Sequence, residues 1–305
     1  MYASGGNQVA VSVIIPTTCE SHRWASLQRA IGTATSQENV DVKVIVVVNG
    51  ERFSPECLDL LHGMRHLTVL YMQQGSAPLA QRRGRLAVHT EYFSFLDDDD
   101  EYLPGGLWAR VQPMLGNPDT AFVASNGYRM VEGRDDLAVQ HPADLVADPL
   151  FALYRENWMS SCGGLFRSAR VTPDFFDDPA PFLEWTYLAY KLALEFPMAW
   201  VGQPTFRIHD TPGSLSKSEK YQAAEVDVLR RIAALRLPPH VASSIKQKIG
   251  LAYHNLSGHN IVLGRAGPAC RFHWMSLRQP GGWRYLLYSR KVLAVMLRAP
   301  FAVRG

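Results

Sequence analysis

Short apolar runs alternate with longer mixed segments along the N-terminal third of the chain. Four of these runs are rich in β-branched or aromatic residues and predict buried strands at residues 9–15, 42–48, 67–72 and 92–96. The segments between them predict helices at about residues 24–31, 55–64 and 79–88, with Ser21 as N-cap of the first. Near-continuous apolar strands alternating with helices are typical of a parallel sheet covered on both faces. We therefore predict an α/β fold with a mostly parallel sheet flanked by helices.

The pattern is less regular in the rest of the chain. It predicts helices at residues 106–115, 150–156 and 184–195, and strands at residues 120–125, 128–131, 163–167, 199–201 and 205–208. Residues 132–146 contain charges, a glycine and a proline, so we expect a mobile insertion there. Two helices at 219–235 and 239–263, and a loosely amphipathic one at 285–297, predict a helical C-terminal appendage.

Charge is distributed unevenly along the chain. The net charge is +3, but all 28 Asp and Glu lie at or before Asp227. Of the 31 Lys and Arg, 18 lie before Asp227 and 13 after it, so the part up to Asp227 carries −10 and the part after it carries +13. An acidic body with a basic tail predicts an anionic partner for the tail.

The cysteines and the N-terminus point to an intracellular protein. Four scattered cysteines form no CxxC pair and are expected to be reduced thiols: Cys19, Cys57, Cys162 and Cys270. The first residues lack the basic and apolar regions of a signal peptide. No apolar run reaches the length of about 18 residues that a membrane span needs. We expect a cytoplasmic protein.

Four consecutive carboxylates, Asp97–Asp100, follow the predicted strand at residues 92–96. Like charges in a row repel one another unless a cation or many N–H donors gather there. Ligands of open α/β sheets bind beyond the carboxyl ends of the strands. The stretch is therefore either a solvated acidic turn or a site for Mg²⁺ or Mn²⁺ with a nucleotide diphosphate. An EF-hand is excluded, because Tyr102 stands where that loop needs glycine.

Four segments in order resemble family 2 glycosyltransferases of the GT-A fold: VSVIIPTTCE, VIVVVNG, EYFSFLDDDD, and LEWTYLAYKLA before RIHDTPGSLSKS. The resemblance implies a GT-A catalytic domain at residues 1–217, with a nucleotide-sugar half at about 9–126 and an acceptor half at about 127–217. Residues 218–305 would be the basic helical region. It also implies inverting transfer of a sugar from a nucleotide-sugar, with UDP-sugar as the expected donor, and a divalent cation.

The resemblance assigns roles to the strand ends. Asp97 and Asp99 match the D-x-D pair: Asp99 is the direct metal ligand, and Asp97 contacts the ribose or a metal-bound water. Asp98 is placed with the donor-binding residues, although the motif itself leaves it spare. The first loop supplies further nucleotide contacts, for which turn and capping chemistry is the alternative: Pro16, Thr17, Thr18 and Glu20.

Two further donor contacts come from the resemblance. Asn49 stands in the turn where the family usually has an acidic residue that receives a base N–H, and this weakens the case for uracil. Arg82, in the stretch Gln81–Gly84, is the first choice for the arginine that approaches the diphosphate, although the register is ambiguous. A solvated basic helix face is the alternative for Arg82.

Glu184 is the candidate catalytic base. It would take the proton from an acceptor hydroxyl as that oxygen attacks the anomeric carbon from the face opposite the leaving group. A role as dipole partner at a helix start is the alternative. His209 is expected to contact the diphosphate or the metal, and the loop after it, to Lys217, could close over the donor.

The basic tail leaves several partners open. Lys and Arg interleaved with Trp and Tyr predict peripheral attachment to the inner face of the cell membrane, near a glycan or lipid-linked glycan acceptor. The alternative is a helix packed on the acidic body. Nucleic acid is not expected, because no nucleic-acid motif accompanies the charge. For the function, the alternatives are a sugar-phosphate nucleotidyltransferase and a catalytically silent binding module.

Overall fold

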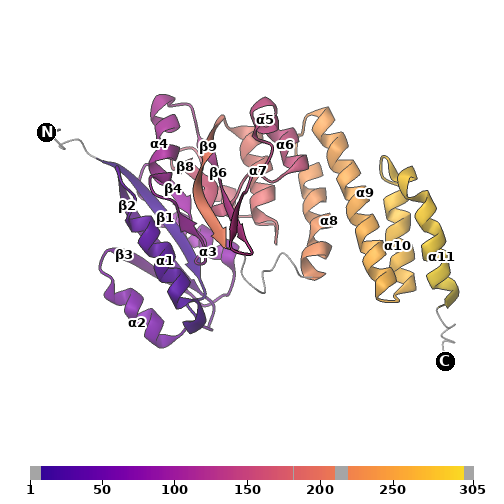
Figure 1. Cartoon of the computed structure of the whole chain (residues 1–305), viewed down its shortest axis with the longest axis horizontal. Coiled ribbons are helices and arrows are strands. Elements are labelled where there is room, and N and C mark those ends of the chain that lie inside the picture. Colours follow the sequence, from indigo (N-terminus) through magenta and orange to yellow (C-terminus); the bar gives the residue numbers. More distant parts are fainter. Residues whose placement is uncertain (1–7, 181, 210–218, 299–305) are drawn as a thin grey trace. The chain divides into compact units, whose positions relative to one another are not determined.

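The computed structural model describes residues 8–180, 182–209 and 219–298 (Figure 1). The chain divides into two compact units. The first comprises Met1–Pro179 and Glu184–Pro212, and the second comprises Ala180–Leu183 and Gly213–Gly305.

One continuous sheet organises the first unit. Its strands are β1 (Val9–Thr17), β2 (Val40–Asn49), β3 (Leu67–Met72), β4 (Tyr92–Phe95), β5 (Glu101–Tyr102), β6 (Phe122–Val131), β7 (Arg134–Leu137), β8 (Gly164–Arg167) and β9 (Met198–His209). They lie in the order β3-β2-β1-β4-β8-β6-β9-β5, and β7 pairs with β6 beside this path. The four strands predicted in the N-terminal third are confirmed, with boundaries that differ by a few residues at most.

The N-terminal half of the sheet is parallel, as predicted. β1 pairs in parallel with β2 and β4, and β2 pairs in parallel with β3. The connections run through α1 (Trp24–Thr35), α2 (Pro55–Gly63) and α3 (Ala77–Leu86). Because parallel crossovers are right-handed, α3 lies on the face opposite α1 (Figure 1). The apolar strands are thus buried on both sides, with β1 residues such as Val13 and Ile14 fully buried.

The other half of the sheet is mixed. β8 pairs antiparallel with β4 and β6, whereas β6 pairs in parallel with β9. The helices of this half are α4 (Gly106–Gly116), α5 (Pro142–Ala147), α6 (Pro149–Arg155) and α7 (Glu184–Glu195), with a short 3₁₀ turn, η2 (Ser161–Gly163), and another, η3 (Pro173–Phe176). The segments predicted as separate strands at 120–125 and 128–131 form the single strand β6, and those at 199–201 and 205–208 form β9.

Two local predictions were wrong. The expected mobile insertion at residues 132–146 contains β7, which forms a hairpin with β6 through Glu132 and Gly133, both at positive φ, and most of α5. Ser21 does not cap α1, because it opens a one-turn 3₁₀ helix, η1 (Ser21–Arg23), and α1 begins after Arg23 without a side-chain cap.

The second unit is helical, as predicted. Its helices are α8 (Glu219–Ala233), α9 (Pro239–Val262), α10 (Ala266–Leu277) and α11 (Ser289–Arg298), with the 3₁₀ segment η5 (Gly282–Tyr288) between the last two. The helix predicted at 285–297 is therefore broken in two. α9 packs against α8 and α10, and α10 packs against α11 (Figure 1). No helix among the described residues is long and apolar enough to cross a bilayer.

Candidate functional site

The carboxyl ends of β1, β2 and β4 meet at one edge of the sheet. Thr17 pairs with Val48 at the end of β1, and the Leu96 amide after β4 donates to the Ile14 carbonyl at 3.0 Å. The four aspartates leave β4 immediately beyond this point. The sequence-based expectation that the acidic stretch shares a rim with the first loop and with Asn49 is therefore confirmed.

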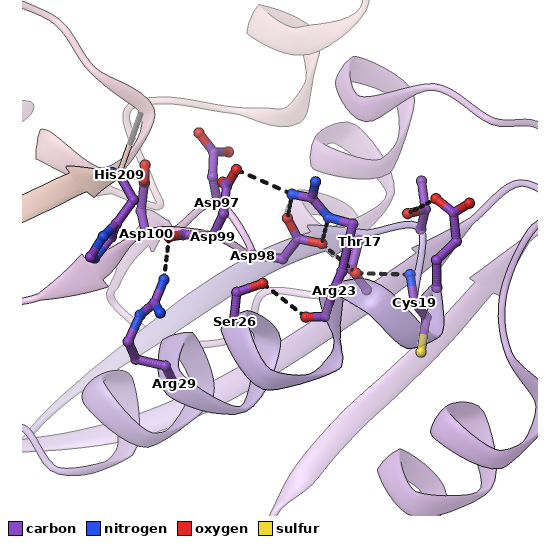
Figure 2. Close-up of polar contacts among 12 residues, drawn as sticks. Thr17, Cys19, Arg23, Ser26, Arg29, Asp97, Asp98, Asp99, Asp100 and His209 are labelled. Atoms are coloured by element: carbon purple, nitrogen blue, oxygen red, sulfur yellow. Dashed lines mark hydrogen bonds and ion pairs between the residues drawn. The ribbon is translucent and has the colours of Figure 1, made fainter. Parts of the chain in front are cut away.

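Asp98 is held by the first loop and the start of α1. The Thr17 hydroxyl donates to Asp98 Oδ2 at 2.6 Å, and Arg23 binds both carboxylate oxygens in a two-pronged ion pair (Figure 2). The Asp98 side chain is 7% exposed. A bidentate guanidinium–carboxylate pair fixes both position and orientation. Asp98 thus joins the acidic stretch to the first loop, and its carboxylate is already bound by protein groups.

Asp97 and Asp100 are held by η2 and β9. The Ser161 hydroxyl donates to Asp97 Oδ2 at 2.6 Å. The Cys162 thiol lies 3.7 Å from Asp100 Oδ2, and the His209 amide donates to Asp100 Oδ1 at 3.0 Å. The three segments meet because β8, which follows η2, pairs with β4.

Burial and crowding disfavour ionisation of these two carboxyls. Burial, together with the charges of the neighbouring aspartates and of Glu184, raises the pKa of Asp97 to about 6, although the Ser161 hydrogen bond opposes the shift. Burial and the charges of Asp97 and Asp99 likewise raise the pKa of Asp100 well above its usual range. The stretch is thus a concentration of negative charge with limited access to water.

Asp99 is partly exposed at the rim. Its side chain is 20% exposed, and Arg23 lies 3.3 Å from its Oδ2. Arg29 donates to the Asp99 main-chain carbonyl at 2.7 Å, which fixes the backbone from the α1 side (Figure 2). The carboxylate is therefore presented by a backbone that α1 holds in place.

The donor set of the rim fits a hard divalent cation. In the part of the chain that the structure describes, no three His, Cys, Asp or Glu side chains converge as an all-protein metal centre. Mg²⁺, however, is usually bound by one or two carboxylates together with substrate phosphates. Asp97 and Asp99, two residues apart on one loop, supply oxygen ligands of that kind.

The first loop is held by its own polar groups. Cys19 adopts a left-handed backbone with φ 52°, and its amide donates to the Thr17 hydroxyl. The Thr18 hydroxyl donates to Glu20 at 2.9 Å, and Arg52 lies 3.9 Å from Glu20. Pro16 lies inside the β1–β2 ladder. These contacts match the turn chemistry that the sequence left as the alternative, and they leave the donor-binding role a prediction.

Asn49 joins two loops of the rim. Its amide nitrogen donates to the Thr17 carbonyl at 2.9 Å, and its side-chain oxygen accepts from the Ser76 amide at 2.9 Å. Asn49 is 5% exposed. Both ends of the side-chain amide therefore bind the protein backbone, and a contact with a base remains a prediction.

Arg82 and Arg85, two of the three arginines of α3, differ in environment. Arg82 is half-buried and forms an ion pair with Asp177. Arg85 is buried, with its guanidinium donating to the carbonyls of Ser168 and Val171 and its Cζ 4.4 Å above the Phe93 ring. Arg85 is thus part of the core, and Arg82 is the arginine of this pair that reaches the surface.

Glu184 begins α7 and lies within electrostatic reach of Asp97. It lines a small cleft together with Gln81, Phe175 and Trp185, among other residues. The Trp185 ring packs against Phe95 at 5.2 Å, so it belongs to the aromatic core at this end of the sheet. The packing of Trp185 thus fixes the first turn of α7, and this turn carries Glu184 near Asp97.

His209 closes β9 next to the acidic stretch. Its Nε2 is buried, has no hydrogen-bond partner, and lies 3.4 Å from Glu101 Oε1. The His209 ring thus lies against Glu101, while the His209 amide donates to Asp100. The loop expected to close over the donor, residues 210–217, lies outside the described residues.

The sequence analysis missed the residues that position the aspartates. Arg23, Arg29, Ser161 and Cys162 all contact the stretch across 62 to 75 positions in sequence. No local pattern marks these side chains, because their role arises only when α1 and η2 are packed beside β4. The short polar segment Ser160–Gly163 before β8 is the nearest signal that the sequence contains.

Comparisons with known proteins agree with this arrangement. A model of the family "Glycosyl transferase family 2" matches residues 12–172. Uncharacterized glycosyltransferases of Rickettsia typhi and Rickettsia prowazekii are each 29% identical over 125 residues, which cover 40% of this chain and 37% of theirs. The chain thus matches well under half the length of these curated relatives.

Solved structures show the same fold. S. aureus TarS 1–349 in complex with UDP-GlcNAc aligns with a TM-score of 0.61 at 12% identity, over 87% of this chain and 81% of TarS. The same protein in complex with UDP aligns with a TM-score of 0.54 at 14% identity, over 85% and 75%. The predicted GT-A fold is confirmed. The family model matches more than half of the length of this chain, and the chain therefore belongs to glycosyl transferase family 2.

Proposed function

We propose that the protein is an inverting glycosyltransferase that moves a sugar from a nucleotide-sugar to an acceptor hydroxyl. The observation that carries this proposal is the family match over residues 12–172, which contains the acidic stretch at the end of β4. The family match does not favour a sugar-phosphate nucleotidyltransferase. The donor is proposed to be a UDP-sugar, by analogy with TarS, whose structures contain UDP-GlcNAc or UDP.

The donor diphosphate is proposed to lie over Asp97 and Asp99. Two carboxylates on one loop suit Mn²⁺ or Mg²⁺ that is also bound by phosphate oxygens. When bound there, the cation would neutralise charge on the departing nucleoside diphosphate. Asp98 would act from within the protein, because Thr17 and Arg23 already bind it. In this proposal, Asp98 positions Asp97 and Asp99.

The remaining predicted donor contacts come from other elements of the first unit. Thr18 and Glu20 lie in the first loop, Asn49 and Pro16 lie at the ends of their strands, and Arg82 lies on the neighbouring helix α3. Asn49 would act by holding the rim loop in place for the base. Arg82 would approach the diphosphate after release from Asp177, a surface ion pair of small net stability.

Glu184 is proposed as the base. At the first turn of α7, beside Asp97, it would accept the proton of the acceptor hydroxyl. Attack from the face opposite the leaving group inverts the anomeric centre and needs no carboxylate nucleophile. His209, with a buried Nε2 that lacks a hydrogen-bond partner, is proposed as a further ligand of the cation or diphosphate after a change of ring orientation.

Release of nucleoside diphosphate tests this function. Purified protein is incubated with a panel of nucleotide-sugars and Mn²⁺ or Mg²⁺, and the released UDP or other diphosphate is measured. We expect metal-dependent release from at least one UDP-sugar, with slow transfer to water when no acceptor is present. If nucleotide-sugars bind but none is cleaved with any glycan acceptor, the chain is a silent binding module.

The acceptor is proposed to be a glycan, free or carried on a lipid, in polysaccharide or glycan assembly. A lipid-carried acceptor requires the enzyme to reach a membrane surface. The 13 Lys and Arg after Asp227, with no acid among them, support a peripheral location on the inner face of the cell membrane. Comparing transfer to water-soluble and lipid-linked acceptors checks this step.

A further inference from the structure

The last part of the helical unit exposes a group of large apolar side chains, here called the η5–α11 face. It consists of large side chains of η5 and α11 that are 46–87% exposed: Leu286, Leu287, Leu293, Met296 and Leu297. Exposed leucines on a globular protein are normally scattered singly. Here the large apolar side chains are exposed close together in sequence, between Leu286 and Leu297, and such a grouping is typical of an interaction site.

The packing of η5 explains why its leucines point away from the unit. Tyr285 stacks on His254 of α9 at 4.2 Å, and the Tyr288 ring meets the same imidazole edge-on at 4.5 Å. Residues three apart share one side of a 3₁₀ helix. The two tyrosines therefore anchor one side of η5, and Leu286 and Leu287 between them face outward.

Helix α11 continues the same arrangement. Val292 is 3% exposed and packs inward, whereas Leu293 and Leu297, one turn apart, are exposed. Figure 1 shows α11 at the end of the row of antiparallel helices, so no described helix of this unit covers its outer side. α11 has 10 residues, too few to cross a bilayer. An apolar face of this length instead suits a helix that lies along a membrane surface.

The basic residues beside this face favour an anionic partner. Arg284, Arg290 and Lys291 flank the leucines, and the chain contains no acidic residue after Asp227. Trp283 is 71% exposed, with Arg284 Cζ 6.0 Å from its ring centre. Tryptophan and basic residues beside an apolar face are typical of the zone between lipid headgroups and acyl chains.

We propose that the η5–α11 face inserts into the interfacial zone of a bilayer containing anionic lipids. Leu286, Leu287, Leu293, Met296 and Leu297 enter between the headgroups, and the flanking cations contact lipid phosphates. This inference deepens the peripheral location proposed above, but it rests on the surface of the helical unit and not on catalysis. A second copy of the chain is disfavoured as the occupant, because the basic residues around the face would repel their own copies.

Binding of the full-length protein to vesicles tests the inference without an activity assay. Co-sedimentation is measured with vesicles of phosphatidylcholine alone and with phosphatidylglycerol added. Leu293→Glu/Leu297→Glu is compared with Leu60→Glu, which places one added carboxylate at an exposed leucine of α2, away from the η5–α11 face. Circular dichroism and thermal melting verify that each variant is folded.

We expect the wild type and Leu60→Glu to bind anionic vesicles and to bind phosphatidylcholine at least about tenfold more weakly. The α11 double variant should lose at least about tenfold in affinity for anionic vesicles. Unchanged binding of that folded variant would overturn insertion and leave an electrostatic association only. Absence of wild-type binding, or a dimer by analytical ultracentrifugation that the double variant abolishes, would also overturn the inference. The assay of nucleoside diphosphate release stays interpretable in every case, because it does not depend on vesicle binding.

Discussion

The four aspartates after β4 have different partners, and this separates their roles at the scale of single residues. Asp98 binds Thr17 and Arg23, and Asp100 accepts from the His209 amide. These two carboxylates are bound by the protein. Asp97 accepts from one serine, and Asp99 is partly exposed. The ligand roles that the D-x-D spacing predicts for Asp97 and Asp99 remain part of the proposal.

Glu184→Gln should abolish transfer and leave nucleotide binding intact. The amide keeps the shape of the side chain but cannot accept the acceptor proton, and a general base contributes roughly 10²- to 10⁴-fold. Diphosphate release with saturating donor and acceptor measures the loss. Glu195→Gln, at the exposed far end of α7, is the matched control and should retain activity. Equal rates for both variants would remove Glu184 from the mechanism.

Ser161→Ala should weaken metal-dependent binding of UDP by about tenfold or more. The Ser161 hydroxyl stabilises the ionised form of the half-buried Asp97, and a hydrogen bond to a charged group contributes about 1.5 kcal/mol or more. Calorimetric titration of UDP with Mn²⁺ measures the change. Ser161→Thr keeps the hydroxyl and should restore most of the affinity. Loss in both variants would mean that this position serves packing alone.

At the scale of elements, the position of α3 depends on one close contact. A Cβ at Gly84 would lie inside van der Waals contact with Ile14 and 3.2 Å from Val47 Cγ2. Helix α3 therefore lies directly on β1 and β2, the strands whose ends form the rim. Its approach also sets where Arg82 emerges.

Gly84→Ala should destabilise the protein by about 1–3 kcal/mol, because overpacking forces shifts of the helix or the strands. Gly32→Ala, at an exposed position of α1 with no neighbour within 4 Å, should instead stabilise it by about 0.5–1 kcal/mol. Urea unfolding of both variants provides the comparison. If the two substitutions had the same effect, the close packing of α3 would be contradicted.

The apolar pattern was sufficient to predict the parallel half of the sheet and most helices. It failed where tertiary contacts decide the structure. β7 is a polar strand that pairs only because β6 continues beyond the core, and periodicity alone could not reveal it. Breaks were predicted within β6 and β9, but both remain continuous, although their pairing shifts around Ser125–Tyr128.

The candidate site was predictable only in part for the same reason. The acidic stretch, the first loop and Asn49 could be placed at one edge because parallel strands end together. Arg23 and Ser161 could not be found, since their contacts with the aspartates span 75 and 64 positions of sequence. The apolar and polar pattern of one helix or strand does not reveal which side chains of another element will contact it.

At the scale of the whole molecule, the uneven charge suits two different proposed tasks: donor binding by the part of the chain up to Asp227, and attachment to an anionic surface by the part after it. The part of the chain up to Asp227 carries −10, and the proposed donor is itself an anion. An acidic body repels a nucleotide diphosphate, so a divalent cation at Asp97 and Asp99 would have to reverse the local field. The +13 carried by the part after Asp227 is instead available for an anionic surface. The two tasks can be tested separately, because they use different residues.

The most direct test of the central claim is calorimetric titration of UDP into the wild type and Asp99→Ala, each with Mn²⁺ and with EDTA. We predict that the wild type binds UDP with Mn²⁺ and loses at least about tenfold in affinity with EDTA. Asp99→Ala, which removes the partly exposed carboxylate of the rim, should bind weakly in both conditions. Equal affinity of the two proteins with Mn²⁺, or wild-type binding unaffected by EDTA, would contradict a cation-assisted nucleotide site at the end of β4.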